Sequence, residues 1–328
     1  MQSNVIISSK KNKGKKIIDF IKNYNTYLIL VLCLVVCVSI SPDFLTLANA
    51  INIGRQYSGL VIVSLGMLMV ILTGGIDLSV GSIVALGSVT LAICLNNGLG
   101  MFLSVAITIF IGFVCGTVSG FLVAKVKMPP FIVTLAMLTI VSGIAFMMSN
   151  GSPINTPDNT ISRLGQGTIF GNIPLLVVLA VIFLIVFLFI VNYTSFGRII
   201  IAIGSNETAV KLSGIRTNWF KMGVYSISGV CAAVCGIVST SRTAIGTPLF
   251  GAGIELDAIA ACVIGGASLA GGEGSAAKTI VGVLILALIG NIMNLLSVPS
   301  YPQSIIKGLI IIVSTLIQVS TSSTKKAV

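Results

Sequence analysis

Residues 173–193 read IPLLVVLAVIFLIVFLFIVNY, a run without a charged side chain. A helix that crosses the hydrocarbon core of a bilayer needs ~20 mainly apolar residues, so this stretch is long enough to span it once. In lipid only helices and closed barrels satisfy the backbone, and barrel strands alternate polar with apolar residues. This stretch does not alternate. It therefore predicts a membrane-crossing helix.

The same pattern recurs along the chain. The expected spans are 24–41, 56–73, 78–96, 101–124, 130–149, 173–193, 221–241, 256–272, 276–297 and 303–321. Across the 328 residues, 55% are hydrophobic and 8% are charged, whereas about a quarter are charged in an ordinary soluble domain. This composition excludes a soluble enzyme. The predicted fold class is all-α: a polytopic membrane protein with about ten transmembrane helices.

The placement of lysine and arginine predicts the orientation, because these residues concentrate in cytoplasmic segments. With the N-terminus inside, only four of the 19 lie outside: Arg55, Arg163, Arg242 and Lys307. Both termini should therefore be cytoplasmic. We divide the chain into a basic cytoplasmic tail (1–23), a single transmembrane domain (24–321) and a cytoplasmic C-terminal tail (322–328). No aromatic residue interleaves the lysines of the first tail, which favours contact with lipid headgroups over nucleic acid.

The chain contains few residues of the types that act in catalysis or bind metal ions. Histidine is absent, and the seven cysteines sit inside apolar runs without a CxxC pair, so neither a metal site nor a disulfide framework is expected. No GxxxxGK[ST] phosphate-binding motif occurs. We therefore expect a chain that is not an enzyme and binds no cofactor. If it works as a pump, the ATPase is another chain.

The first informative motif is GGIDLSVG at residues 74–81. A carboxylate at mid-bilayer costs ~2.5–3.5 kcal/mol, so Asp77 between two apolar spans is unusual. The paired glycines permit a helix break that lines a cavity. Alternatively, the segment is a tight cytoplasmic turn in which Asp77 caps the next helix. Spacing alone leaves both interpretations open.

The second motif is GSNETAVKLSGI at 204–215, inside the longest cytoplasmic connection, 194–221. Ser205 or Asn206 can cap a short helix, Glu207 complements its N-terminal dipole and Gly214 can end it. Its apolar positions are Ala209, Val210, Leu212 and Ile215. Such a helix either fits the groove of a soluble partner or lies on the membrane surface.

Two further motifs lie nearer the C-terminus. GIELDAIA at 253–260 precedes GGASLAGGEGS at 265–275, whose small residues allow helices or loops to approach closely. Asn291 and Asn294 are three apart and share a helix face. They line a polar route or bind a neighbouring helix.

These four motifs, in this order, closely resemble the membrane-spanning permease subunit of ribose/xylose/galactose-type sugar ABC importers, from about Asn52 to Ile317. The resemblance implies a bacterial cytoplasmic (inner) membrane location, a second permease copy or related subunit, a twin-domain ABC ATPase and an extracytoplasmic sugar-binding protein. It identifies the family motif with Gly74, Gly75, Asp77, Gly81, Glu255, Asp257, Gly265, Gly266, Gly271, Gly272 and Gly274. The segment that couples to the ATPase would use Gly204, Asn206, Glu207, Ala209, Leu212, Gly214 and Ile215.

A sugar is neutral and rich in hydroxyl groups, so its route needs hydrogen-bonding groups rather than charge. The expected pathway residues are Asp77, Ser79, Asn291 and Asn294. A ribose-like pentose, a hexose and a furanose-like signalling molecule all fit. The alternatives are an ABC permease for a non-sugar metabolite and an ion-coupled secondary transporter, which would use membrane-embedded acids. A scaffold without transport would leave the glycine-rich motifs unexplained.

Overall fold

The computed structural model describes residues 26–156, 159–169, 171–299 and 301–310, together with 312 and 316. The two tails expected at 1–23 and 322–328 lie outside the described residues, as does part of the last expected span, 303–321. Within the described part, six helices are long and apolar enough to cross a membrane. They are α2 (Leu47–Leu72), α4 (Met101–Ala124), α5 (Pro130–Ser149), α7 (Leu175–Tyr193), α9 (Thr217–Thr243) and α11 (Ala276–Leu295).

Shorter elements complete the chain. The helices are Thr26–Ile40, η1 (Pro42–Leu45), α3 (Val80–Asn96), α6 (Asn159–Gln166), α8 (Ser195–Leu212), α10 (Ile254–Ile264) and residues 301–310. Strand β1 (Ile154–Asn155) pairs antiparallel with β4 (Ile245–Gly246), and β2 (Thr168–Ile169) with β3 (Ile173–Pro174).

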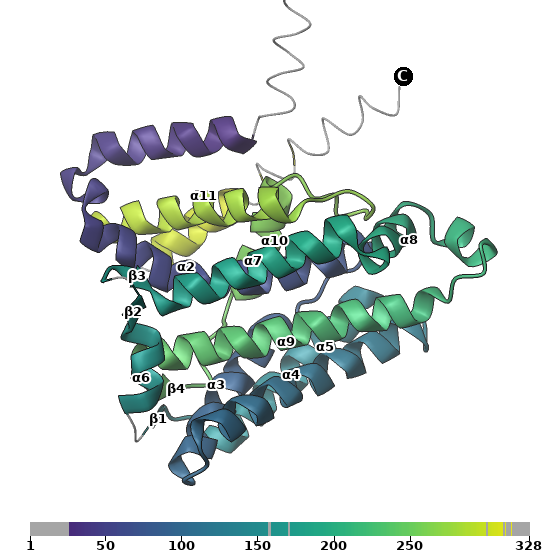
Figure 1. Ribbon diagram of the computed structural model, residues 1–328, viewed down its shortest axis with the longest axis horizontal. Helices are drawn as coiled ribbons and strands as arrows, with labels where there is room; N and C mark the ends of the chain where they lie inside the picture. Colours follow the sequence, from purple (N-terminus) through teal and green to yellow (C-terminus); the bar gives the residue numbers. More distant parts are fainter. Residues whose placement is uncertain are drawn as a thin grey trace, which may run out of the picture.

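The helices form two layers whose axes run in roughly the same direction (Figure 1). One layer holds Thr26–Ile40, α2, α7, α10 and α11, and the other holds α3, α4, α5 and α9. Helix α6 and the short strands gather at one end, and α8 lies at the other. The loops that the sequence places on the cytoplasmic side therefore lie at the α8 end, and the loops that it places on the opposite side of the membrane lie at the end with the strands. Which end faces the cytoplasm remains a prediction.

Most expected spans match a helix, and two of them, 101–124 and 130–149, match it to the residue. The span expected at 56–73 starts earlier, at Leu47. Thr46 caps this helix by accepting a hydrogen bond from the Asn49 amide, so the helix continues through polar residues that an apolar window leaves out.

The span expected at 256–272 is wrong. Helix α10 ends at Ile264 after 11 residues, about 16 Å, which is too short for a hydrocarbon core of about 30 Å. Gly266 then takes φ +84°, which ends the helix. The chain before α10 is not helical and follows α3: a side chain at Gly246 would collide with Ser88, and one at Gly251 with Gly81. This part of the chain therefore combines a non-helical segment with a short helix.

Glycines allow α4 to pack closely on α9. Gly112, Gly116 and Gly120 recur every four residues on one face of α4. A side chain at Gly116 would collide with the carbonyl of Tyr225, and one at Gly120 would lie 2.8 Å from the carbonyl oxygen of Met222. Small residues at this spacing let helix backbones touch, which is how helices associate in lipid. This contact was not among the sequence predictions, although its spacing is visible in the sequence.

We predict that Gly116→Leu destabilises the fold, because the new side chain must push α4 away from α9. Overpacking of this kind costs up to about 3 kcal/mol. Thermal unfolding of the full chain in detergent should show a lowered midpoint and a lower yield. Gly143→Leu is the matched control, since nothing lies within 4 Å of a Cβ at Gly143 on α5. Equal effects of the two substitutions would contradict the packing argument.

Candidate functional site

Asp77 lies inside the protein, in the loop between α2 and α3. Its side chain has no exposed surface, and Oδ1 accepts hydrogen bonds from the Ser79 amide at 3.0 Å and the Ser79 hydroxyl at 2.5 Å. Oδ2 accepts one from the Ser228 hydroxyl at 2.8 Å. Ser228 is well along α9, roughly 16 Å from its first residue Thr217. Asp77 thus organises the start of α3, and it does so in the interior rather than in a surface turn.

Both sequence interpretations of GGIDLSVG therefore hold in part: the segment is a helix break, and the carboxylate organises the next helix. Ser79 is as fully buried as Asp77. Neither side chain is open to a substrate in this conformation, so their role as sugar contacts stays a prediction.

A second interruption lies beside the first. A Cβ at Gly81, near the start of α3, would collide with the carboxylate of Glu255 on α10 and would lie 2.6 Å from the Gly251 carbonyl oxygen. The two short helices thus begin next to each other. Residues 75–78 read GIDL and residues 253–256 read GIEL, a likeness that is visible in the sequence alone. Glycine-interrupted segments at corresponding places in two halves of a transporter often flank its binding site.

A polar cavity of about 310 Å³ opens at the start of α10. This volume is at the lower end of the usual range for small-molecule sites, about 300–1,000 Å³. Side chains from several helices line it, and its hydrogen-bonding members are Gln56, Tyr57, Ser239, Arg242, Asp257, Asn294, Gln303 and Lys307. Asp257 binds Lys307 at 2.7 Å, and Gln303 donates to Asn294 Oδ1 at 2.9 Å. Of the four expected pathway residues, only Asn294 lines this cavity.

Asn291 has the structural role that the sequence left open. It is 6% exposed and forms a two-way amide pair with Asn49 on α2. Asn291 Nδ2 donates to Asn49 Oδ1 at 2.7 Å, and Asn49 Nδ2 donates to Asn291 Oδ1 at 3.0 Å. The pair fastens α11 to α2.

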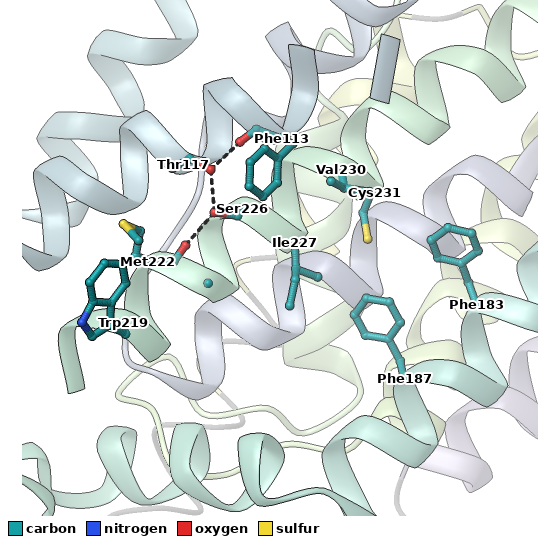
Figure 2. Close-up of a pocket in the computed structure, with 11 residues that line it drawn as sticks. Phe113, Thr117, Phe183, Phe187, Trp219, Met222, Ser226, Ile227, Val230 and Cys231 are labelled. Carbon is teal, nitrogen blue, oxygen red and sulfur yellow. Dashed lines mark hydrogen bonds between the residues drawn. The ribbon is translucent and has the colours of Figure 1, made fainter. Parts of the chain in front are cut away.

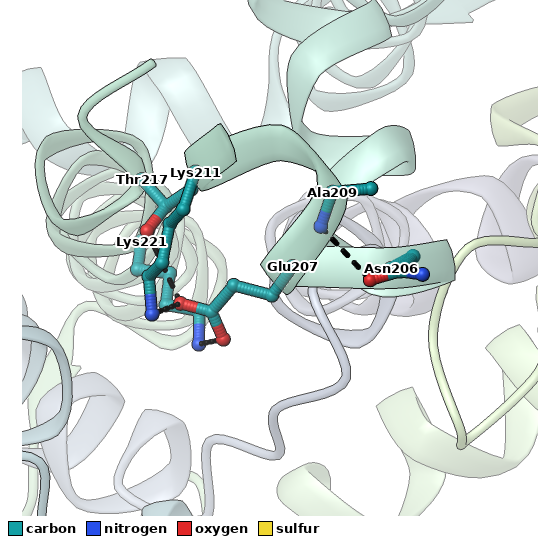
Figure 3. A network of polar contacts seen from close by, with 6 residues as sticks. All are labelled: Asn206, Glu207, Ala209, Lys211, Thr217 and Lys221. Atoms are coloured by element: carbon teal, nitrogen blue, oxygen red, sulfur yellow. Dashed lines mark hydrogen bonds and ion pairs between the residues drawn. The ribbon is translucent and has the colours of Figure 1, made fainter. Parts of the chain in front are cut away.

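The predicted short helix of the coupling segment is present. Helix α8 is interrupted at Asn206, whose backbone takes φ −160° and ψ 92°. The side-chain oxygen of Asn206 accepts a hydrogen bond from the Ala209 amide at 3.0 Å and so caps a new helix (Figure 3). That helix ends at Leu212, and Gly214 follows with φ +82°. Asn206 and Gly214 thus have the roles expected of them.

Glu207 anchors this short helix to α9. Its carboxylate binds Lys221 at 2.6 Å and Lys211 at 2.9 Å and accepts a hydrogen bond from Thr217 at 3.1 Å (Figure 3). Partial burial opposes ionisation, but the hydrogen bonds and charge of the lysines lower the pKa of Glu207 from 4.5 to about 2. The acid is therefore ionised at neutral pH and ties the segment to the first turns of α9.

The exposed side of the short helix carries two apolar residues among polar ones. Leu212 is 85% exposed and Ala209 is also exposed, whereas Val210 is 8% exposed and packs inward. Ile215 is half-buried. Of the four expected apolar positions, Ala209 and Leu212 thus offer a surface to a partner.

Three chain segments meet backbone to backbone in the middle of α8, just before its interruption at Asn206. The Gly272 amide donates to the carbonyl of Leu72 at 3.0 Å, which fastens the glycine-rich loop to the end of α2. A Cβ at Gly204 would collide with both of these groups, and one at Gly74 would lie 3.3 Å from the Ala270 carbonyl oxygen. We call this contact the glycine junction: Leu72–Gly74, Gly204–Ser205 and Ala270–Gly272.

Close packing or a positive φ also requires glycine at the other glycine positions of the family motif. Gly75 faces the Tyr225 hydroxyl, Gly265 packs on the backbone of Lys278, Gly266 and Gly271 have positive φ, and Gly274 packs on Leu68 and Leu72.

Broken crossings, a polar cavity beside one of them and a braced helix at one end together define the class: a multi-pass, helical membrane transport protein. The chain belongs to the family of branched-chain amino acid transport system permease components, whose sequence model matches residues 49–315. It is a multi-pass protein of the inner membrane.

Relatives narrow the resemblance to sugar importers. The chain is 40% identical over 302 residues to the ribose import permease protein RbsC of Haemophilus influenzae, covering 90% of this chain and 93% of that one. Identity to RbsC of Escherichia coli K12 is 40% over 295 residues, covering 88% and 92%. The L-arabinose transport system permease protein AraH of Escherichia coli K12 is 35% identical over 305 residues, covering 93% of each. No solved structure matches. The expected likeness to permease subunits of sugar ABC importers is confirmed.

We predict that Gly204→Val opens the glycine junction and weakens the coupling between α8 and transport. Mutations between two coupled sites change the coupling free energy by about 0.5–2 kcal/mol, which corresponds to a roughly two- to thirtyfold change in uptake. The variant should still insert in the membrane, because the long apolar helices are unchanged. Uptake of labelled sugar by cells, normalised to the amount of inserted protein, measures the effect. Gly143→Val, in open space, should leave uptake unchanged; if both variants transport normally, the junction has no role.

Proposed function

We propose that this chain forms the translocation pathway of an ABC importer for a monosaccharide, a ribose-like pentose or a related sugar. The ribose and arabinose permeases named above supply the substrate class. The cavity at the start of α10 supports it chemically, because amide, hydroxyl and paired charged groups can exchange hydrogen bonds with a neutral polyol.

The proposed assembly contains partners on both sides of the membrane. A twin-domain ABC ATPase binds ATP and supplies the energy, so this chain has no catalytic role and holds no cofactor. An extracytoplasmic binding protein delivers the sugar, and a second permease copy, identical or related, completes the pathway. Titration of the binding protein with candidate sugars and non-sugar metabolites decides the cargo.

The single observation that carries the coupling proposal is the braced short helix with two apolar side chains facing outward. Leu212 and Ala209 are presented outward, while Glu207 holds the helix against Lys221 on α9. A helix that presents apolar residues from a rigid base fits the groove of a partner. Closure of the ATPase pair would press on this helix, and the glycine junction would pass the movement to α2 and the glycine-rich loop.

Two of the described acids near the interrupted helices are already engaged, which disfavours an ion-coupled mechanism at these two groups. Asp77 receives hydrogen bonds on both carboxylate oxygens, and Asp257 is paired with Lys307.

We call Ala209 and Leu212 the docking surface of α8. We predict that Leu212→Asp weakens binding of the ATPase by at least about tenfold, because a charge replaces the more exposed of these two apolar side chains. Sugar uptake should be lost in parallel, while the chain stays inserted. Co-purification with the ATPase measures binding. Leu212→Met preserves apolar contact and should behave as wild type. Normal ATPase binding and uptake in the Asp variant would refute the docking surface.

We also predict that Asn294→Leu lowers uptake by about two- to tenfold, the effect of one lost neutral hydrogen bond. ATPase binding should be unchanged, since Asn294 lies at the opposite end of the molecule from α8. Initial rates of uptake over a range of sugar concentrations check this. Asn97→Leu, at an exposed helix end outside the cavity, is the control. If the two variants transport equally well, the cavity is not on the sugar route.

A further inference from the structure

An apolar groove of about 420 Å³ lies between α4, α7 and α9 (Figure 2). Phe113, Phe183, Phe187, Ile227 and Val230 supply most of its walls. The hydroxyls of Thr117 and Ser226 lie 2.8 Å apart, and each also lies within hydrogen-bonding distance of a backbone carbonyl one turn earlier. Their polar atoms are therefore satisfied, and the groove presents hydrocarbon to whatever enters it.

The groove is long and thin. Along α9 it extends from Trp219 to Cys231, about 18 Å at 1.5 Å per residue. This length is close to half of a hydrocarbon core of about 30 Å, which is the depth of one leaflet. The groove therefore suits an acyl chain that lies along α9.

One end of the groove is basic and aromatic. Trp219 is 53% exposed and lies with Met222 at the opposite end from Phe183 and Phe187 (Figure 2). The Lys125 ammonium sits 4.6 Å from the centre of the Trp219 ring. Lys127 and Arg216, both exposed, lie close along the chain to these two residues. Tryptophan favours the membrane–water interface, and exposed lysines there attract anionic headgroups.

We propose that this groove binds one acyl chain of an anionic phospholipid, with the headgroup at Lys125 and Trp219. The apolar walls match the chain, and the basic end matches the negative headgroup. In the predicted orientation this end faces the cytoplasm, so the lipid belongs to the inner leaflet. The site is separate from the polar cavity and from the docking surface on α8, and it does not depend on the cargo.

The experiment uses the intrinsic fluorescence of Trp219, which is the only tryptophan in the 328 residues. The full chain is reconstituted in mixed vesicles of phosphatidylglycerol and phosphatidylcholine. In one series the phosphatidylglycerol is brominated near the headgroup end of its acyl chains, and in the other the phosphatidylcholine is. The ratio of quenching by the two lipids at equal mole fraction reports the preference and cancels changes in the brightness of the indole.

We expect phosphatidylglycerol to be preferred by about fivefold, the usual effect of one basic residue near an anionic surface. Lys125→Gln should remove most of this preference, and Val230→Phe, which fills the groove, should reduce quenching by both lipids. Arg198→Gln removes another exposed cation outside the groove and should keep the wild-type ratio.

Three results would overturn the proposal. Equal quenching by both lipids in the wild type would mean ordinary bulk lipid. A preference that survives in both Lys125→Gln and Val230→Phe would place the anionic site elsewhere. Weak quenching by either lipid would mean that protein, such as a second copy of this chain, covers Trp219.

Discussion

Close approach of backbones, which only glycine permits, is the constraint on which this structure depends. Between helices in lipid there is no hydrophobic driving force, so van der Waals packing must hold them together. Gly112, Gly116 and Gly120 bring α4 onto α9 in this way. The glycine junction depends on the same close approach, because Gly204 of α8 lies directly against the Leu72 carbonyl and the Gly272 amide. A junction without side chains between its segments leaves little slack, so a displacement of α8 has to move its neighbours.

The buried side chain of Asp77 is a second constraint on the structure. Burying an ionisable group in a membrane protein is costly, and here hydrogen bonds from Ser79 and Ser228 offset that cost. They also fasten the start of α3 to the middle of α9. The carboxylate that first suggested a substrate contact is therefore a structural anchor in this conformation. The polar cavity lies instead at the second interruption, beside α10, where Asp257 and Asn294 line it.

Periodicity and capping chemistry carried the sequence predictions that succeeded. Apolar runs located α4 and α5 to the residue, and the expected cap at Ser205 or Asn206 and stop at Gly214 located the short helix of α8, because these signals are local. The failures arose where distant segments meet. The apolar window extended the span to residue 272, although the Gly265–Gly266 pair at which α10 ends is visible in the sequence. Local signals could not show that Asn291 would pair with Asn49, or that Glu207 would also bind Lys221 on α9.

In the proposed importer, a movement of the short helix of α8 reaches the loops at the ends of α2 and α10 through the glycine junction. Amide hydrogen exchange of the assembled importer, with and without a non-hydrolysable ATP analogue, tests this most directly. Exchange should change together in the short helix at 206–213, in the loop at 73–77 and in the glycine-rich loop at 269–273. A nucleotide-dependent change confined to 206–213, with the other two segments unaltered, would contradict it.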